Sequence, residues 1–258
     1  MVGRPVAIAF VAGHAFGVAD HQAIPSPPKM IFLDAGGTLI EVRTSVGDIY
    51  SRIALAHGIQ RRPEELQNAF QRCFPAQPPM AFSPEVSITE LKRLEFHWWR
   101  SLVRDVFDEA TPSTALDDCF HELFTFFGTA ASWRIFPDVA PALNRLKDYG
   151  IKFAIISNFD SRLESLLDGL GLSDYFEAVH ISTRVGAAKP DPQIFRAALL
   201  HHGLAPEEAW HVGDSLREDA EGALGAGMQG IWLDRENVGK GRVRHGRITG
   251  LDQLIDLM

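Results

Sequence analysis

The segment that most constrains the fold of this chain is residues 30–40, which read MIFLDAGGTLI. Its first four residues are apolar without interruption, a pattern typical of a strand buried on both faces, as in a parallel sheet. The apolar run ends at Asp34, and Gly36 and Gly37 follow in a sequence typical of a tight turn. Ligands of open α/β sheets bind beyond the carboxyl ends of the strands, so Asp34 is a candidate for chemistry.

Further along the chain, short apolar segments alternate with segments of helical periodicity. The predicted strands are 151–156, 178–181, 209–212 and 230–233, and the predicted helices are 138–149, 161–170, 193–201, 216–226 and 251–257. We expect Asp138 to cap the first of these helices. The alternation predicts an α/β fold, in which a parallel sheet has helices on both faces. Asp34, Ser157 and Asp214 then each end a strand and meet in one crevice.

A helical insertion separates the first strand from this alternation. Apolar residues at helical spacing predict helices at 46–59, at 63–74, from about residue 87 onward, and at 113–127. Residues 134–137 return the chain to the sheet. We therefore expect a main domain made of residues 30–44 and 134–258, and an inserted all-helical cap domain made of residues 45–133.

The first 29 residues are expected to lie outside the fold. Residues 6–18 are apolar after a single Arg4, which resembles a secretory signal, but His14 and two glycines interrupt the run. A proline-rich stretch then leads directly into Met30. We favour a dispensable extension or a misplaced start codon over a signal sequence.

Composition argues against several classes of protein. The net charge is −8, and the one loose basic cluster, residues 240–247, is more typical of a solvated loop than of a nucleic-acid surface. No apolar run reaches the length that spans a membrane. The two cysteines, Cys73 and Cys119, lack metal-ligand spacing, and idle thiols are typical of the reducing cytoplasm. We expect a cytoplasmic protein that acts on a small molecule, with no nucleic-acid or membrane partner.

Lys189 completes the group of residues expected beside the strand ends. It lies in the segment GAAKPD, residues 186–191. Two acids, a hydroxyl and a lysine on one rim suit Mg²⁺ and a phosphoryl group, because Mg²⁺ prefers carboxylate, carbonyl, water and phosphate oxygens. A carboxylate left partly free can attack phosphorus and form an aspartyl phosphate. The hydroxyl and the lysine then neutralise the phosphoryl oxygens.

In order and spacing, these segments resemble the four motifs of the haloacid dehalogenase-like (HAD) hydrolases that carry a helical cap. The resemblance covers residue 30 to the C-terminus and implies a Rossmann-like, three-layer core. The corresponding segments, in motif order, are 34–39, 157–158, 189–192, and 213–215 together with Asp219. The stretches VGDIYSRIALAHGI and SNFDSRL most resemble the rhythmically-expressed-gene-two-like branch of the family.

The family resemblance also implies roles for individual residues. It implies four catalytic residues, of which the first is the nucleophile: Asp34, Thr38, Ser157 and Lys189. It implies three residues that bind the phosphoryl group of the substrate: Ser157, Asn158 and Lys189. It implies a Mg²⁺ site with four contributors: Asp34, the backbone carbonyl of Gly36, Asp214 and Asp219.

One position departs from the family pattern. Phosphatases of this family carry a second Asp two residues after the nucleophile, as the general acid and base, and here that residue is Gly36. General acid–base catalysis contributes about 10²–10⁴-fold, so we expect low activity. The expected function is a Mg²⁺-dependent, phosphatase-like hydrolase that acts on a small phosphorylated metabolite through an aspartyl phosphate.

Other functions stay open at this point. A 2-haloacid dehalogenase needs no acid at position 36, but such enzymes usually carry an aromatic residue there and lose the metal-binding acid of the fourth motif. Asp214 and Asp219 are both retained, which argues against a dehalogenase. A non-catalytic binding or regulatory protein would keep the fold and the metal pocket, although intact Asp34 and Lys189 argue against this interpretation.

The cap is expected to select the substrate, because caps close over the crevice and exclude water. Four cap arginines are candidate anion binders, although solvated helix arginines are commoner: Arg52, Arg72, Arg93 and Arg100. A phosphonate-cleaving variant would need a Schiff-base lysine in the cap, and Lys92 is better explained as a surface lysine. Four cap aromatic residues are expected to be core rather than pocket, because of their helical spacing: Trp98, Trp99, Phe126 and Phe127.

Overall fold

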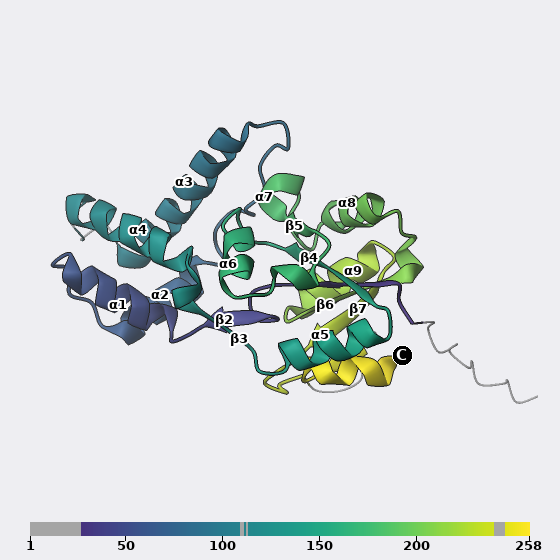
Figure 1. Cartoon of the computed structure of the whole chain (residues 1–258). Helices are drawn as coiled ribbons and strands as arrows, with labels where there is room; N and C mark the ends of the chain where they lie inside the picture. The colour runs from purple at the N-terminus through teal and green to yellow at the C-terminus, as the bar shows by residue number, and fades with distance from the viewer. Residues whose placement is uncertain (1–26, 109–110, 112, 240–245) are drawn as a thin grey trace, which may run out of the picture.

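Figure 1 shows the computed structural model of the chain, which describes residues 27–108, 111, 113–239 and 246–258. The strands are β1 (Met30–Leu33), β2 (Ile40–Val42), β3 (Trp133–Ile135), β4 (Lys152–Ser157), β5 (Val179–Ile181), β6 (Ala209–Gly213), β7 (Gln229–Leu233) and β8 (Gly246–Ile248). The α-helices are α1 (Val46–Ala56), α2 (Pro63–Cys73), α3 (Ile88–Phe107), α4 (Ser113–Phe127), α5 (Val139–Asp148), α6 (Leu163–Gly169), α7 (Ser182–Val185), α8 (Pro192–His202) and α9 (Gly222–Gly225). Helical segments of 3₁₀ or π type are η1 (Ala130–Ser132), η2 (Ser173–Tyr175), η3 (Pro206–Glu208), η4 (Leu216–Glu221) and η5 (Leu251–Leu257).

The main sheet is parallel and has the strand order β5-β4-β1-β6-β7-β8. β1 lies between β4 and β6, and all four of its residues are buried, as its unbroken apolar run predicts. Helices cover both faces of the sheet, so the predicted Rossmann-like α/β fold is confirmed. This strand order brings the carboxyl ends of β4, β1 and β6 side by side.

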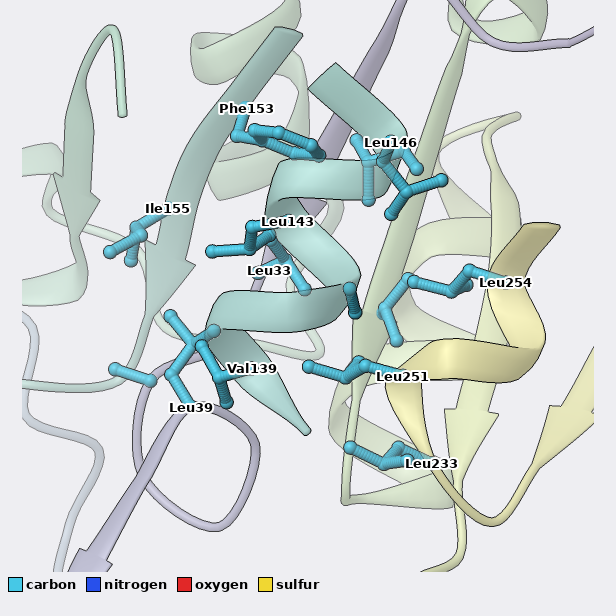
Figure 2. Close-up of a cluster of buried hydrophobic side chains, with 14 of the residues drawn as sticks. Leu33, Leu39, Val139, Leu143, Leu146, Phe153, Ile155, Leu233, Leu251 and Leu254 are labelled. Carbon is cyan, nitrogen blue, oxygen red and sulfur yellow. The ribbon is translucent and has the colours of Figure 1, made fainter. Parts of the chain in front are cut away.

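Strand side chains alternate between two apolar cores, one on each face of the sheet. On one face, side chains of the strands pack against α5 and η5; Figure 2 labels Leu33, Leu143, Leu146, Phe153, Ile155 and Leu254 in this core. On the other face, Phe32 and Ile156 share a core with Ile194 and Phe195 of α8. Burying one such side chain stabilises the fold by roughly 1.5–3 kcal/mol, so the two cores hold the strand ends in place.

Helices α1–α4 pack on one another and stand apart from the sheet (Figure 1). We call residues 45–133, which contain them, the cap. Local signals explain where these helices begin. Ser45 and Asp48 form a reciprocal capping box at α1, Pro63 occupies the first turn of α2, and Ser87 accepts a hydrogen bond from the Glu90 amide at α3.

An antiparallel ribbon of β2 and β3 was not predicted. It forms where the chain leaves the sheet for the cap and where it returns, with Ile40 opposite Ile135 and Val42 opposite Trp133. Three residues per strand are too few to show a period of two in the sequence. The ribbon joins the two connections between the sheet and the cap.

The prediction that Asp138 caps α5 was wrong. Asp138 makes no side-chain hydrogen bond to that helix. Its carboxylate accepts hydrogen bonds from Nη1 of Arg235 at 2.9 Å and from the backbone N of Leu251 at 2.8 Å. Arg235 is far away in sequence, and its charge makes it a stronger partner than a backbone amide of α5.

The predicted helix 216–226 is divided into a π-helical turn, η4, and α9. In the wider turn, the backbone amides of Asp219 and Ala220 both donate to the carbonyl of Ser215. The carboxylate of Asp219 also accepts from the backbone N of Ser215 at 3.0 Å. π-Turns are frequent at functional sites, and this one places Asp219 beneath the strand ends.

The predicted N-terminal extension falls mostly outside the described residues, which begin at 27. Lys29 already contacts the sheet, because its backbone N donates to the carbonyl of Glu208 and its carbonyl accepts from Lys152. Among the described residues, no helix has both the length and the apolar character needed to cross a membrane.

A histidine cluster lies beside the edge strand β5. Nε2 of His180, on β5, lies 3.3 Å from Nε2 of His202, at the end of α8, and His201 packs beside both rings. Burial lowers the pKa of His180 to about 4, and the charges of His202 and His201 add to this effect. Glu177 and Lys152 flank His202.

We predict that this cluster makes the fold acid-sensitive. The unfolded chain takes up a proton on His180 near pH 6.5 and the folded chain only near 4, so stability is full above about pH 6.5 and falls as the pH approaches 4. Replacing His180 by Leu should reduce the loss of thermal stability between pH 7 and pH 5. His97→Gln, which changes an exposed cap histidine, is the control; equal losses in both variants would contradict the prediction.

Candidate active site

The three strand ends predicted to meet do line one cavity. Asp34 follows β1, Ser157 ends β4 and Asp214 follows β6, and these are adjacent strands of the sheet. Lys189 joins them from the segment between α7 and α8. The cavity has a volume of about 790 Å³ and lies between the strand ends and the cap. This size is typical of a small-molecule site.

Lys189 lies between two carboxylates at the floor of the cavity. Its Nζ is 2.7 Å from Oδ1 of Asp34 and 2.5 Å from Oδ1 of Asp219, and its side chain is 2% exposed. Burial by itself would lower the pKa of Lys189, but the charges of Asp219 and Asp34 outweigh it and hold that pKa above its usual value. Lys189 is therefore a fixed positive charge.

Burial affects the two partners of Lys189 differently. It raises the pKa of Asp34 above the usual value, although Lys189 opposes this rise. Burial would also raise the pKa of Asp219, but Lys189 and His211 outweigh it and hold that pKa below the usual range. Asp219 is well supplied with donors, because Nε2 of His211 lies 2.8 Å from the oxygen that Lys189 also contacts. Asp219 is thus the firmly ionised member of the group.

For Asp214, the charge of Lys189 compensates only in part. Burial, together with the charges of Asp34 and Asp219, raises the pKa of Asp214 to about 7. Carboxylate oxygens of Asp34, Asp214 and Asp219 lie within 4.8 Å of one another. Three carboxylates face one ammonium here, and hard oxygen donors with excess negative charge suit a divalent cation such as Mg²⁺. The donor set therefore fits the predicted metal.

Glycines make this close approach possible. Gly37 has φ +79°, and a Cβ there would collide with the carboxylate of Asp214. A Cβ at Gly213 would collide with the carboxylate of Asp219. Gly36 differs, because it lines the cavity and a Cβ there would meet nothing within 4 Å. Steric crowding is thus not the reason that position 36 lacks a side chain.

Two predicted site residues have surroundings that their motifs did not predict. Asn158 lines the cavity, but its amide donates to the carbonyl of Lys189 at 2.9 Å and accepts from the backbone N of Lys189 at 2.7 Å. Asn158 therefore holds the backbone of Lys189. Thr38 is fully buried, is not among the residues that line the cavity, and its hydroxyl has no hydrogen-bond partner in the described chain.

The basic residues of the cap do not reach the cavity. None of the five appears among the residues that line it: Arg52, Arg72, Lys92, Arg93 and Arg100. Arg93 pairs with Glu90, and Arg100 pairs with Asp117. Arg52 lies over the ring of Phe126, 5.1 Å from its centre. The interpretation of these residues as surface side chains agrees with the structure.

The expectation for the cap aromatic residues was wrong in three of four cases. Trp98, Trp99 and Phe127 line the cavity, and only Phe126 does not. These residues also pack against the core of the cap, which is why their helical spacing was typical of core residues. A helix that separates a core from a cavity carries apolar residues on both sides, and spacing does not distinguish the two.

Sequence reasoning missed Glu95, which connects the cap to the sheet domain. Glu95 is 2% exposed on α3. Its carboxylate accepts from the backbone N and the hydroxyl of Ser161, at 3.0 and 2.5 Å, and from the hydroxyl of Thr183 at 2.7 Å. The available signal was its position, because residue 95 shares the helical face of Leu91 and Leu102. A charge on an apolar face needs buried partners.

His211 was also missed. It is fully buried on β6, and burial lowers its pKa. One ring nitrogen lies against Asp219, and Nδ1 has no hydrogen-bond partner in the described part of the chain. His211 supports Asp219 from below and does not line the cavity.

The fold and this arrangement of acids and lysine define a class of protein. The chain belongs to the haloacid dehalogenase-like hydrolases, since the model of that family matches residues 28–227. The predicted family resemblance is therefore confirmed.

Individual relatives agree with this assignment. The chain is 33% identical over 206 residues to haloacid dehalogenase-like hydrolase domain-containing protein 3 of Mus musculus, which covers 78% of this chain and 79% of that protein. It is 30% identical over 202 residues to the Rhythmically expressed gene 2 protein of Drosophila melanogaster, which covers 74% and 77%. The crystal structure of a HAD phosphatase from Thermococcus onnurineus matches with a TM-score of 0.62 and 25% identity, over 89% of this chain and 97% of that one.

We predict that Glu95 stabilises the attachment of the cap. Glu95→Ala leaves the donors of Ser161 and Thr183 buried without an acceptor, so the free energy of unfolding should fall by about 2–4 kcal/mol in urea denaturation. Glu90→Ala on the same helix is the matched control, because its pair with Arg93 lies on the surface and water screens it. Equal effects of the two substitutions would contradict the prediction.

Proposed function

We propose that this protein is a Mg²⁺-dependent, phosphatase-like hydrolase that acts on a small phosphorylated metabolite through an aspartyl phosphate. The observation that carries the proposal is the pairing of Asp34 with Lys189 at 2.7 Å on the cavity floor, with Asp214 and Asp219 beside them. The similarity to the HAD phosphatase of Thermococcus onnurineus supports the same reaction class.

In this proposal the carboxylate of Asp34 attacks the phosphorus atom. Ser157 and Lys189 lie on the same floor and neutralise the phosphoryl oxygens as the bond to the leaving group breaks. Asn158 acts indirectly, since it holds the backbone from which Lys189 extends. Thr38 supports the loop after Asp34 through its backbone, because its carbonyl accepts from Arg235 at 2.8 Å.

Asp34, Asp214, Asp219 and the carbonyl of Gly36 would hold the metal ion. When bound, Mg²⁺ would supply positive charge against the phosphoryl oxygens and the three carboxylates. A cytoplasmic location is part of the proposal, because Cys73 and Cys119 are both free thiols.

A non-catalytic binding protein is the second candidate, and Gly36 is the observation that favours it. No acid stands two residues after Asp34, and within the described cap no carboxylate lines the cavity to replace it. Glu218, on η4, does line the cavity, and its carboxylate accepts a hydrogen bond from the side-chain amide of Asn158 at 3.3 Å. Glu218 is therefore the group to test as a substitute acid.

We predict slow, Mg²⁺-dependent hydrolysis of 4-nitrophenyl phosphate and acetyl phosphate, whose leaving groups need little help from an acid. Asp34→Asn should reduce both activities to background, because the nucleophile is lost. Asp168→Asn, a change at an exposed acid on α6, is the control. If the wild-type rate in Mg²⁺ does not exceed that of Asp34→Asn, the binding-protein candidate is favoured; metal-independent chloride release from a 2-haloacid would identify a dehalogenase instead.

We also predict that Gly36→Asp raises turnover. The position has room for a side chain, and its φ lies outside the left-handed region. A general acid there should accelerate alkyl phosphates by up to about 10²–10⁴-fold, and 4-nitrophenyl phosphate by much less. Gly36→Asn has the same shape without the acid and is the control. Equal rates for the two variants would show that the missing acid is not the limitation, and Glu218→Gln would then be compared with wild type.

A further inference from the structure

The wall of the cavity that the cap provides is aromatic. Within the described residues of the cap, no charged side chain lines the cavity, and most of the side chains that do are aromatic. Phe74 lies at the centre of this wall. Its ring is 5.2 Å from that of Phe70, 6.0 Å from that of Trp98 and 6.2 Å from that of Trp99. We call these four residues the aromatic wall.

The polar atoms of the aromatic wall already have partners inside the protein. Nε1 of Trp98 donates to the carbonyl of Pro78 at 2.9 Å, and Nε1 of Trp99 donates to Asp160 at 2.6 Å. Gln77, which also lines the cavity, donates from its amide to Asp105 at 2.7 Å. The aromatic wall therefore offers the faces and edges of its rings to a ligand, while the hydroxyl of Tyr50 and the Oε1 atom of Gln77 belong to other cap residues that line the cavity.

The charged residues that line the cavity either lie on the floor, opposite the aromatic wall, or already form ion pairs within the protein. Arg162 is already paired, because its guanidinium donates to Asp160 and to the carbonyl of Phe124, and it lies 3.9 Å from the centre of the Phe124 ring. Glu41 pairs with Arg134. Arg217 is exposed and has no ion-pair partner among the described residues, but it lies on η4, three residues after Asp214 in the chain. The cavity thus has a charged floor and an apolar opposite wall.

Phe74 is unusual in being 41% exposed while lying against other rings. Large apolar surface that stays accessible inside a concave site is typical of ligand binding. Hydroxyl or charged groups turned toward this wall would lose water without gaining hydrogen bonds from the rings, which is costly. A flat apolar group would gain contact with several rings.

We propose that the leaving group of the substrate is aromatic and weakly basic, so that the protein is selective for aryl phosphates whose ring lies against Phe70, Phe74, Trp98 and Trp99. This inference rests on the proposed function for the phosphoryl end of the site. Gly36 points to the same class independently, since a phenolate, whose conjugate acid has a pKa of about 10, leaves with less help from an acid than an alkoxide does.

The reaction balances without a further reactant. An oxygen of Asp34 bonds to phosphorus, the bond between phosphorus and the aryl oxygen breaks, and its electron pair leaves with the phenolate, which takes a proton from water. A second water then adds to phosphorus, the bond to Asp34 breaks to restore the carboxylate, and the proton that this water releases neutralises the hydroxide left by the first water. The products are one phenol and one inorganic phosphate for each aryl phosphate and water consumed.

The first test compares three phenol leaving groups in the presence of Mg²⁺. We expect kcat/KM for 1-naphthyl phosphate to exceed that for phenyl phosphate by about tenfold, because the second ring adds apolar contact. 4-Carboxyphenyl phosphate should be the poorest substrate although its leaving group is more acidic than phenol, because its charge meets the aromatic wall. An order that simply follows leaving-group acidity would overturn the inference.

Substitution of the wall provides the matched comparison. Phe74→Ala should lower the ratio of the naphthyl to the phenyl rate several-fold. Leu55→Ala also removes an exposed apolar side chain of the cap, on α1, but that residue does not line the cavity, and the ratio should not change. Equal ratios in wild type and Phe74→Ala would overturn the inference.

A binding measurement separates this inference from the proposed function. By calorimetry with Mg²⁺, 1-naphthylmethylphosphonate should bind the wild-type protein at least about tenfold more tightly than methylphosphonate. Equal affinities would overturn the aromatic specificity even if acetyl phosphate is hydrolysed in an Asp34-dependent way. Preferential binding of the naphthyl compound without any turnover would support the specificity and contradict the proposed function alone.

Discussion

The site depends on one buried ammonium group. Lys189 lies between Asp34 and Asp219, with the three side chains almost entirely shielded from water. A buried charge is tolerated only when it is paired and hydrogen-bonded, so each member of this group requires the others. The pairing joins the end of β1, the segment before α8 and the turn after β6. Asn158 then ties the end of β4 to the same lysine through its backbone.

The cap is attached to this centre by buried polar contacts as well as by the two chain connections. Glu95 of α3 binds Ser161 and Thr183, and the hydroxyl of Ser182 donates to the carbonyl of Met80 at 2.6 Å. Such contacts fix the orientation of the cap, because moving it would leave buried donors or acceptors without a hydrogen-bond partner, which is costly. The aromatic wall is therefore held at a defined position above the charged floor.

Much of the charged floor was predictable because strand ends are local features of sequence. An apolar run that stops at Asp34, and others that stop before Ser157 and Asp214, predict that these residues meet once the sheet is parallel. The role of Asn158 was not predictable, since its motif does not state which backbone its amide contacts. The prediction that Asp138 caps helix α5 failed for the same reason, because Arg235, the residue with which Asp138 pairs, is distant in sequence.

The sequence by itself determined the class of fold, the family and the residues that gather at the strand ends, because strand burial, turns and motif spacing are written within short stretches of chain. Only the tertiary structure decided which faces of the cap helices border the cavity, and that their basic residues point elsewhere. The physical reason is that an apolar side chain satisfies a core and a ligand-binding wall equally well. Helical spacing shows that a face avoids water. Only the placement of α2 and α3 beside the cavity decides whether protein or ligand replaces that water.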